Sequence, residues 1–257
     1  MNVKLGKYHC CENSFLITTY NEGIDYNELA FKLCSKDMYD VDGLLILKID
    51  PIEVLFFNKD GSEANMCGNG LNCLVHYCYD KYKIYRYIKF KTKAGEFFCE
   101  MIKKAPFYSS VNLGIGDYYK NILKQIVMLN KKEYEVSIFK LGVLHAVIIV
   151  DDLEELDGKE IFENKFFNKE ANINFVKILN NKTFEMVTYE KGVGYTKACG
   201  TGAGACSYIL HEYYGLDSQL DVLTKGGVLQ VEISDNVYLT AESAFIENVE
   251  VSLWKYY

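Results

Sequence analysis

The sequence repeats itself, and this repeat limits the folds open to the chain more than any other feature. The tetrapeptide Cys-Gly-Asn-Gly at residues 67–70 recurs as Cys-Gly-Thr-Gly at residues 199–202, 132 residues further on. Thr-Lys-Ala-Gly at residues 92–95 recurs as Thr-Lys-Gly-Gly at residues 224–227, at the same spacing. Because two separate pairs share one offset of about half the chain, the sequence predicts two related halves.

Each half is predicted to hold the same elements in the same order. Strands rich in Val, Ile, Leu and Phe precede each Cys-Gly-x-Gly turn or follow the helix after it. The helices expected after the turns, Leu71–Tyr82 and Ala203–Tyr214, are apolar on most sides, which is typical of buried helices. The expected strands are Val41–Ile49, Glu53–Phe57, Tyr87–Lys91, Glu96–Ile102, Val147–Val150, Leu220–Leu223, Val228–Ile233 and Val237–Leu239.

The predicted fold class is therefore α+β, with two pseudo-symmetric halves that are each a mostly antiparallel, barrel-like sheet wrapped around a central helix. We place the first half at residues 1–116 and the second at residues 117–245, and we expect residues 246–257 to return to the first half as a strand. Weaker amphipathic patterns predict three further helices. These are Tyr26–Lys36, Tyr118–Leu129 and Leu153–Glu163.

Charge and hydropathy exclude several classes of partner. The chain has 28 Lys and Arg against 35 Asp and Glu, a net charge of −7, and has no basic run interleaved with aromatic residues. Binding to nucleic acid needs a basic face, so no nucleic-acid partner is expected. No apolar run approaches the roughly 20 residues that span a bilayer, and the first residues lack the apolar segment of a signal peptide. We expect a protein without a membrane partner.

Nine cysteines indicate a reducing compartment, the cytoplasm, because an odd number without an export signal argues against a disulfide framework. A metal site is not expected. The spacings among Cys67, Cys73 and Cys78, and between Cys199 and Cys206, contain no C-x-x-C pair or other zinc-ligand pattern. The cysteines that follow the two turns are interpreted as packing residues.

Each Cys-Gly-x-Gly turn is expected to form an anion site at the start of a helix. Glycines let the backbone approach a ligand closely, and the free N–H groups and helix dipole favour negative charge. A thiol at this place has a lowered pKa because the same N–H groups stabilise the thiolate. For one turn alone, a small buried hydrophobic cysteine would be the better interpretation. The matched pair, Cys67 and Cys199, favours the interpretation that both thiols are reactive.

Two activated thiols related by a pseudo-twofold axis can approach one carbon from opposite sides. One thiolate removes a proton and the opposing thiol delivers another, which inverts the centre by general acid–base catalysis. The helix N–H groups can hold the carboxylate of the substrate and the charge that builds on it. This chemistry requires no cofactor, neither a metal nor pyridoxal phosphate.

These turns and their flanks resemble the diaminopimelate epimerase family of cofactor-independent amino-acid racemases and epimerases. The resemblance rests on Phe57–Glu63 running into Met66–Gly70, and on Tyr189–Gly194 running into Ala198–Ala203. Weaker similarity extends over most of the chain, including Leu141-Gly142 and His145-Ala146-Val147. The resemblance implies an isomerase that acts on a small-molecule amino acid, with the site between the two halves. It also implies a homodimer as one form of assembly, since family members often pair through one half.

The resemblance assigns roles to individual residues. Cys67 and Cys199 match the acid–base pair of the family. Glu190 and Lys191 match positions beside the far end of the substrate. The other matching positions are asparagines that line the substrate cleft, Asn13, Asn58 and Asn172, and donors to the reacting carboxylate, Gly68, Asn69, Gly200 and Thr201. Asp60 and Ser62 are expected to brace their turn rather than touch substrate.

Departures from the family pattern gather at the distal end of the substrate. Lys191 stands where the family has an arginine that grips the distal carboxylate of diaminopimelate, and a point charge does not replace a planar bidentate fork. Val143-Leu144 replaces an Asn-Pro pair of the family. Cys10-Cys11-Glu12 replaces a glycine-rich entry to Asn13, and Ala241-Glu242 a Gly-Pro. The substrate is therefore expected to be an amino acid with a polar side chain, with histidine one candidate and diaminopimelate itself another.

Two alternatives from other classes stay open at this stage. One is an isomerase of the phenazine-biosynthesis type, which resembles this family in fold but uses a carboxylate in place of the cysteine pair. The other is a non-catalytic protein that binds a metal or takes part in thiol redox chemistry.

Overall fold

The structure is a computed structural model and describes residues 2–84, 86–119 and 122–252. The chain divides into two compact units. The first consists of Met1–Val111 and the segment from Ala241 onward, and the second is Asn112–Thr240. Among the helices in the described ranges, none has both the length and the apolar character needed to cross a membrane.

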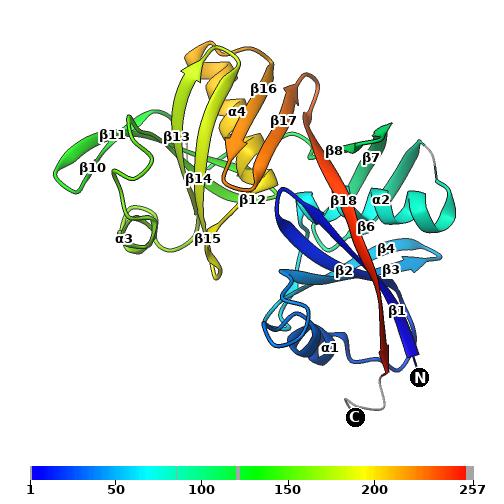
Figure 1. Ribbon diagram of the computed structural model, residues 1–257. Coiled ribbons are helices and arrows are strands. Elements are labelled where there is room, and N and C mark those ends of the chain that lie inside the picture. The colour runs from blue at the N-terminus through cyan, green and yellow to red at the C-terminus, as the bar shows by residue number, and fades with distance from the viewer. Residues whose placement is uncertain (1, 85, 120–121, 253–257) are drawn as a thin grey trace. The chain divides into compact units, whose positions relative to one another are not determined.

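In the first unit the strands pair in succession until the sheet closes on itself. The order is β1, β2, β3, β4, β6, β7, β8 and β18, and β18 pairs back onto β1 (Figure 1). Its strands are β1 Asn2–Cys10, β2 Asn13–Thr19, β3 Gly43–Ile49, β4 Ile52–Asn58, β5 Glu63–Ala64, β6 Tyr87–Thr92, β7 Gly95–Lys104 and β8 Phe107–Asn112. The long strand β18, Val237–Ser252, belongs to this unit from Ala241 onward. Its helices are α1 Tyr26–Leu33 and α2 Gly68–Tyr82. Residues 253–257, part of the expected C-terminal strand, lie outside the described residues.

The second unit repeats this order of elements. Pairing runs through β11, β12, β13, β14, β16, β17 and the start of β18. Its strands are β9 Asp117–Tyr118, β10 Gln125–Leu129, β11 Lys132–Leu141, β12 Val143–Ile149, β13 Asn172–Asn180, β14 Thr183–Glu190, β15 Gly194–Thr196, β16 Gln219–Thr224 and β17 Gly227–Ile233. Its helices are α3 Gly158–Glu163 and α4 Gly200–Tyr214.

The two sheets also share their pattern of strand directions. In the first unit β2–β3 and β4–β6 are parallel, and in the second unit β12–β13 and β14–β16 are parallel. The other principal neighbours, such as β1–β2 and β11–β12, are antiparallel. The prediction of an α+β fold with two similar halves, each a mostly antiparallel sheet around a helix, is confirmed.

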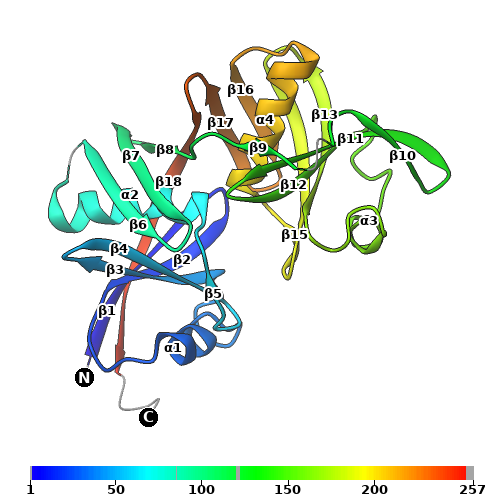
Figure 2. The ribbon, with the colours of Figure 1, turned by 180° about the vertical axis from the view of Figure 1, so that it is seen from behind.

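A long helix occupies the centre of each unit. α4 contacts β11, β12, β13, β16 and β17, and α2 contacts β1, β2 and β7 (Figures 1 and 2). Both helices bury most of their first three turns, including Leu71, Leu74, Ile209 and Leu210. The apolar patterns at residues 71–82 and 203–214 therefore predicted these helices correctly. Such helices are stabilised mainly by burial of apolar surface on several sides.

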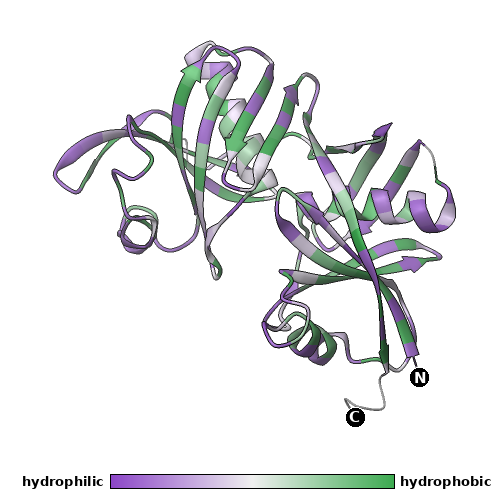
Figure 3. Ribbon diagram, in the orientation of Figure 1, coloured by the Kyte–Doolittle hydropathy of each residue, from purple (hydrophilic) through white to green (hydrophobic). Residues whose placement is uncertain are grey.

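The short helices cover the other face of each sheet. α1 packs Tyr26, Leu29 and Leu33 onto buried residues of β2, β3 and β4. α3 packs Ile161 onto β13 and its neighbours. Hydrophobic and hydrophilic residues accordingly alternate along many strands (Figure 3), as expected for strands whose two faces meet different surroundings.

The helix predicted at Tyr118–Leu129 is wrong; its residues 120–121 lie outside the described residues. The segment instead forms β9 and β10, and β10 makes a hairpin with β11. In β10 the buried Val127 and Leu129 alternate with exposed neighbours, which is the period of a strand. The turn residues Asn130 and Lys131 both have positive φ, 49° and 67°, as a tight two-residue hairpin turn requires.

The helix predicted at Leu153–Glu163 is shorter than expected. It begins only at Gly158, because the Asp157 carboxylate caps it by accepting the Glu160 N–H at 2.9 Å. Further upstream, the Asp152 side chain accepts the Glu154 N–H at 3.1 Å. Such local side-chain bonds stabilise turns in competition with a helix. The helix expected at Tyr26–Lys36 ends at Leu33.

The packing of α4 predicts a difference between two substitutions in the second unit. Leu210 is fully buried on α4, whereas Ile126 on β10 is 54% exposed. Leu210→Ala is expected to lower the free energy of unfolding by about 2–5 kcal/mol, and Ile126→Ala by less than about 0.5 kcal/mol. Urea unfolding followed by circular dichroism measures both. Equal losses would contradict the central position of α4.

Candidate functional site

A cysteine stands at the N-cap of each central helix. Cys67 precedes α2 with φ −145° and ψ 122°, and Cys199 precedes α4 with φ −121° and ψ 107°. In both cases the extended backbone of the cysteine joins the first helical turn, where N–H groups have no acceptor within the helix. The predicted chemical setting of both thiols, at the entrance of a buried helix, is therefore present in each unit.

In the first unit, the Cys67 sulfur lies between a backbone donor and an amide. The Gly70 N–H donates to Sγ at 3.4 Å, and Sγ lies 3.8 Å from Oδ1 of Asn13. An N–H group that donates to sulfur stabilises the thiolate form relative to the thiol. The side chain of Cys67 is half-buried. Asn13 and Cys67, both predicted site residues, are thus brought together.

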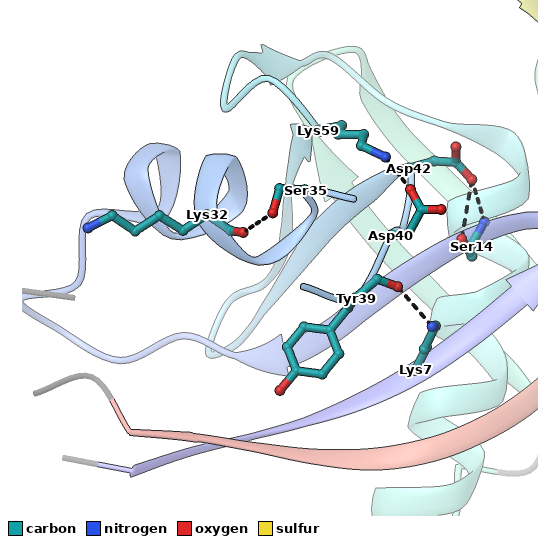
Figure 4. A network of polar contacts seen from close by, with 8 residues as sticks. All are labelled: Lys7, Ser14, Lys32, Ser35, Tyr39, Asp40, Asp42 and Lys59. Carbon is teal, nitrogen blue, oxygen red and sulfur yellow. Dashed lines mark hydrogen bonds and ion pairs between the residues drawn. The ribbon is translucent and has the colours of Figure 1, made fainter. Parts of the chain in front are cut away.

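Asn13 is held in place by the start of β2. The next residue, Ser14, donates its N–H to Oδ2 of Asp42 at 2.8 Å, and the Asp42 N–H donates to the Ser14 carbonyl at 2.9 Å. Beside this pair, the Lys59 amine and the Asp40 carboxylate form an ion pair at 2.5 Å (Figure 4). The loop before β3 therefore positions the amide that contacts the Cys67 sulfur.

Asn58, another predicted site residue, belongs to a tight turn. Its Nδ2 donates to the Ser62 hydroxyl at 3.0 Å, and its backbone N–H donates to the Ser62 carbonyl at 2.8 Å. Ser62 in turn donates its N–H to the Asp60 carboxylate at 2.9 Å. Asp60 and Ser62 thus brace this turn, as expected. Gly68 and Asn69 form the first turn of α2 and are buried.

The cysteine pair that precedes Asn13 forms the turn between β1 and β2. Cys11 and Glu12 have positive φ values of 49° and 57°, a backbone that non-glycine residues rarely adopt. The Cys10 thiol hydrogen-bonds to Cys11, which lowers the pKa of Cys11 and raises that of the fully buried Cys10. A thiol with a lowered pKa therefore lies two residues before Asn13.

In the second unit the sulfur has different partners. Cys199 is 5% exposed, and its side chain makes no capping hydrogen bond to the backbone of α4. Its sulfur lies 3.7 Å from the Thr201 hydroxyl oxygen, and its thiol hydrogen-bonds to the carboxylate of Glu190. Side chains, rather than the backbone contact seen at Cys67, surround this sulfur.

Glu190 lies at the end of β14, beside Cys199. Burial raises the pKa of its carboxyl, and hydrogen bonds from Thr196 and Cys199 partly offset this effect. The Thr196 hydroxyl donates to Oε1 at 2.7 Å. A carboxylate with a raised pKa that accepts a bond from a thiol is suited to take the thiol proton. Glu190 is thus placed next to the sulfur, whereas the family resemblance implied a place at the far end of a substrate.

A buried polar chain lies beneath the entrance of α4. Asn174 donates from Nδ2 to the Ala146 carbonyl at 3.0 Å and faces Nδ1 of His145 at 3.3 Å. Nε2 of His145 lies 3.1 Å from the Thr201 hydroxyl. The Thr188 hydroxyl donates to Oδ1 of Asn174 at 3.0 Å. Burial lowers the pKa of His145 to about 3, so its ring is neutral near pH 7.

Asn172 and Lys191 meet through the backbone. The Lys191 N–H donates to Oδ1 of Asn172 at 2.9 Å, and Asn172 pairs with His145 across β12 and β13. The Lys191 side chain is exposed. The asparagine therefore fixes the backbone of the lysine.

Within the second unit the structure brings Glu190, Thr201 and Cys199 together at the start of α4, with Gly200 in its first turn. Asn172 bonds instead to the backbone of Lys191, the residue after Glu190. Sequence reasoning missed Asn174 and Thr196. The only signal for Asn174 was an amide inside an apolar strand, between Ile173 and Phe175.

The remaining thiols have a different environment. Burial raises the pKa of Cys34 and Cys78 to about 12 and also raises that of Cys73, Cys99 and Cys206. The interpretation of Cys73 and Cys78 as packing residues agrees with this burial. In the part of the chain that the structure describes, no three His, Cys, Asp or Glu side chains are grouped as a metal ligand set.

Comparison with known proteins gives one family. The diaminopimelate epimerase family matches residues 6–116 and 138–245. A diaminopimelate epimerase from Caldanaerobacter subterraneus subsp. tengcongensis is 32% identical over 274 residues, which cover 98% of this chain and all of the relative. Another, from Campylobacter lari, is 37% identical over 221 residues, covering 81% of this chain and 82% of the relative.

Solved structures share the fold at much lower identity. A hydroxyproline epimerase from Agrobacterium vitis superposes with a TM-score of 0.77 at 11% identity, covering 98% of this chain and 93% of that one. A phenazine biosynthesis protein of the PhzF family from Bacillus anthracis gives a TM-score of 0.72 at 13% identity, covering 98% and 99%. The fold and the matches thus define an isomerase of the racemase and epimerase class. The chain belongs to the diaminopimelate epimerase family.

The buried neutral His145 predicts a pH dependence of stability. Below its ordinary pKa of 6.5 the unfolded imidazole binds a proton that the folded one excludes, so stability falls as the pH drops. Between about pH 7.5 and pH 5 this residue is expected to remove about 2 kcal/mol from the free energy of unfolding. Denaturant titrations of the unsubstituted protein and of His145→Gln test this. An unchanged pH dependence in the variant would show that His145 binds protons in the folded state.

Proposed function

We propose that this protein inverts the α-carbon of an amino acid by transferring protons through two cysteine thiols, Cys67 and Cys199. The observation that carries the proposal is the matched position of the two residues. Each is the N-cap of the central helix of its unit, and the two lie 132 residues apart in a repeated motif. Family membership supports the same reaction class.

In the proposed reaction one cysteine is a thiolate and the other a thiol. The thiolate takes the α-proton, the C–H electron pair stays on the substrate, and the thiol delivers its proton to the opposite side of that carbon. One thiolate is consumed and one is formed, so the two cysteines have exchanged protonation states at the end of the reaction. The Gly70 N–H at Cys67, and the Thr201 hydroxyl and Glu190 at Cys199, are suited to stabilise the two states.

The first turns of α2 and α4 are the proposed site for the substrate α-carboxylate. Gly68 and Asn69 open one helix, and Gly200 and Thr201 open the other. Backbone N–H groups at helix starts bind carboxylates and stabilise the charge that forms during deprotonation. Asn13 and Asn172 are proposed to orient the substrate.

The substrate is proposed to be an amino acid with a polar side chain. The names of the relatives favour diaminopimelate. Lys191 and the partly exposed apolar pair Val143-Leu144, where the family has an arginine and Asn-Pro, favour a different distal group, such as the imidazole of histidine. The two candidates share the α-amino acid end, so the proposed proton transfer is the same for both.

Isotope exchange tests the two-thiol reaction. In deuterated water, the protein is expected to exchange the α-proton of its substrate, followed by NMR over a panel of L-amino acids that includes histidine and diaminopimelate. Cys67→Ser is expected to slow proton removal from one enantiomer by about 10²–10⁴-fold, and Cys199→Ser from the other. The reason is that each thiol is the base for one enantiomer.

Cys206→Ala, a buried position on α4, is the control and should leave both exchange rates unchanged. If both serine variants kept normal turnover, the two-thiol reaction would be wrong and a carboxylate-based isomerase of the phenazine-biosynthesis type would gain support. Absence of exchange across the panel, with thiols shown to be reduced, would sink the proposal.

The residue after Glu190 tests the substrate choice. Lys191→Arg is expected to increase the rate with diaminopimelate about tenfold or more, because a bidentate guanidinium adds a charged hydrogen bond to a distal carboxylate. Lys4→Arg, an exposed position on β1, is the matched control. No gain with Lys191→Arg would place the discrimination between substrates elsewhere.

A further inference from the structure

Cys199 and Cys67 differ in how their side chains cap the helices that follow them. At the first site the Gly70 N–H reaches the sulfur, whereas at the second the Cys199 side chain makes no such capping bond. The Thr201 hydroxyl lies 3.7 Å from the Cys199 sulfur. Whether this hydroxyl donates to sulfur depends on what its oxygen accepts from the other side, which is His145.

The tautomer of His145 follows from its neighbour Asn174. The Ala146 carbonyl can only accept, so the Asn174 atom 3.0 Å from it is the Nδ2 amide group, and the Thr188 hydroxyl donates to Oδ1 on the opposite side. Nδ2 cannot accept a hydrogen bond. Nδ2 also lies 3.3 Å from the Asn172 carbonyl, so its two protons are shared among two carbonyls and Nδ1 of His145, 3.3 Å away. A proton on Nδ1 would point at a group that only donates, so we infer that the ring proton lies on Nε2.

The direction of the remaining hydrogen bonds, from His145 to Thr201 and from Thr201 to Cys199, then follows. Nε2–H of His145 donates to Oγ1 of Thr201 at 3.1 Å. Because the oxygen accepts this bond, the hydroxyl proton is available for the Cys199 sulfur. We propose that Asn174 is a positioning residue for Cys199: it holds His145 as the Nε2–H tautomer, which orients the Thr201 hydroxyl to donate to the sulfur. This inference rests on the proposed function for its role in catalysis.

The packing around Gly202 supports a dedicated place for Asn174. A Cβ added at Gly202 would lie 2.5 Å from Oδ1 of Asn174 and 3.2 Å from the Cys199 sulfur. The amide therefore fills the space directly under the first turn of α4. Asn174, His145 and Thr188 are all buried, so water does not compete for these bonds. Glu190 is the titratable group that also contacts the sulfur, and it is unaltered in every variant below.

Asn174→Asp is expected to reverse the direction of these hydrogen bonds while keeping the size of the side chain. The new carboxyl faces the Ala146 carbonyl, so it binds a proton and donates it there, while its oxygen accepts from His145. This selects the Nδ1–H tautomer, Nε2 becomes an acceptor, and the Thr201 hydroxyl turns away from sulfur. The pKa of the Cys199 thiol is then expected to rise by about one to two pH units, because the thiolate loses one hydrogen bond. The measurement is the pH dependence of alkylation by iodoacetamide, resolved by peptide mass spectrometry with fragmentation to separate Cys199 from Cys206.

A second variant separates this role from a general effect on folding. Thr201→Val removes the last donor and should raise the same pKa, and Asn174→Asp in that background should add nothing, because both act on one hydrogen bond. Cys67 in the same samples is the internal control and should keep its pH profile. A shift of both thiols, or additive effects of the two substitutions, would overturn the proposal.

The ring of His145 gives a test that needs no Asn174 variant. Nitrogen-15 NMR of the unsubstituted protein, with His145→Gln for assignment, should show the proton on Nε2; a proton on Nδ1 would refute the inference. None of these measurements uses an amino-acid substrate. If no amino acid in the panel exchanges its α-proton while the pKa shift and the tautomer are as expected, the proposed function is wrong. The inference about Asn174, His145 and Thr201 is then still supported.

Discussion

The first N–H groups of a helix have no acceptor within the helix and need one from elsewhere. At α2 the Cys67 sulfur meets this demand by accepting the Gly70 N–H. The same contact favours a thiolate, so the residue that caps the start of α2 is also one of the two thiols of the proposed reaction. The glycine at the third helical position follows from the same constraint, since a Cβ on Gly70 would lie 3.1 Å from Phe56 and 3.3 Å from the cysteine Cβ.

The two units use one backbone plan with different polar partners. Asn13 and His145 stand 132 residues apart, as do the two N-cap cysteines, and they lie on β2 and β12. In the first unit an amide and a backbone N–H surround the sulfur. In the second, a hydroxyl and a carboxylate do so. Two similar units therefore carry two thiols in different surroundings, which suits the proposed reaction, because its two directions begin with different cysteines as the thiolate.

The short-range patterns were reliable where burial and turn chemistry agreed. Apolar residues on nearly all sides predicted the central helices, and the paired Cys-Gly-x-Gly motifs predicted the position of both cysteines at a helix start. The pattern failed at residues 118–129, where a run of aliphatic residues fits either period. There the outcome was decided by pairing with β11 and by the left-handed turn at Asn130 and Lys131.

The sequence by itself determined the repeat, the fold class and the family, because these depend on local periodicity and on motifs that lie close together along the chain. Only the tertiary structure decided how the thiols differ. Glu190 and Asn174 come from β14 and β13, and their contacts with Cys199 and His145 exist only after the strands have paired. Hydrogen-bond direction in a buried chain depends on which atoms can donate and which can only accept, and that is settled by distances of about 3 Å that no linear spacing encodes.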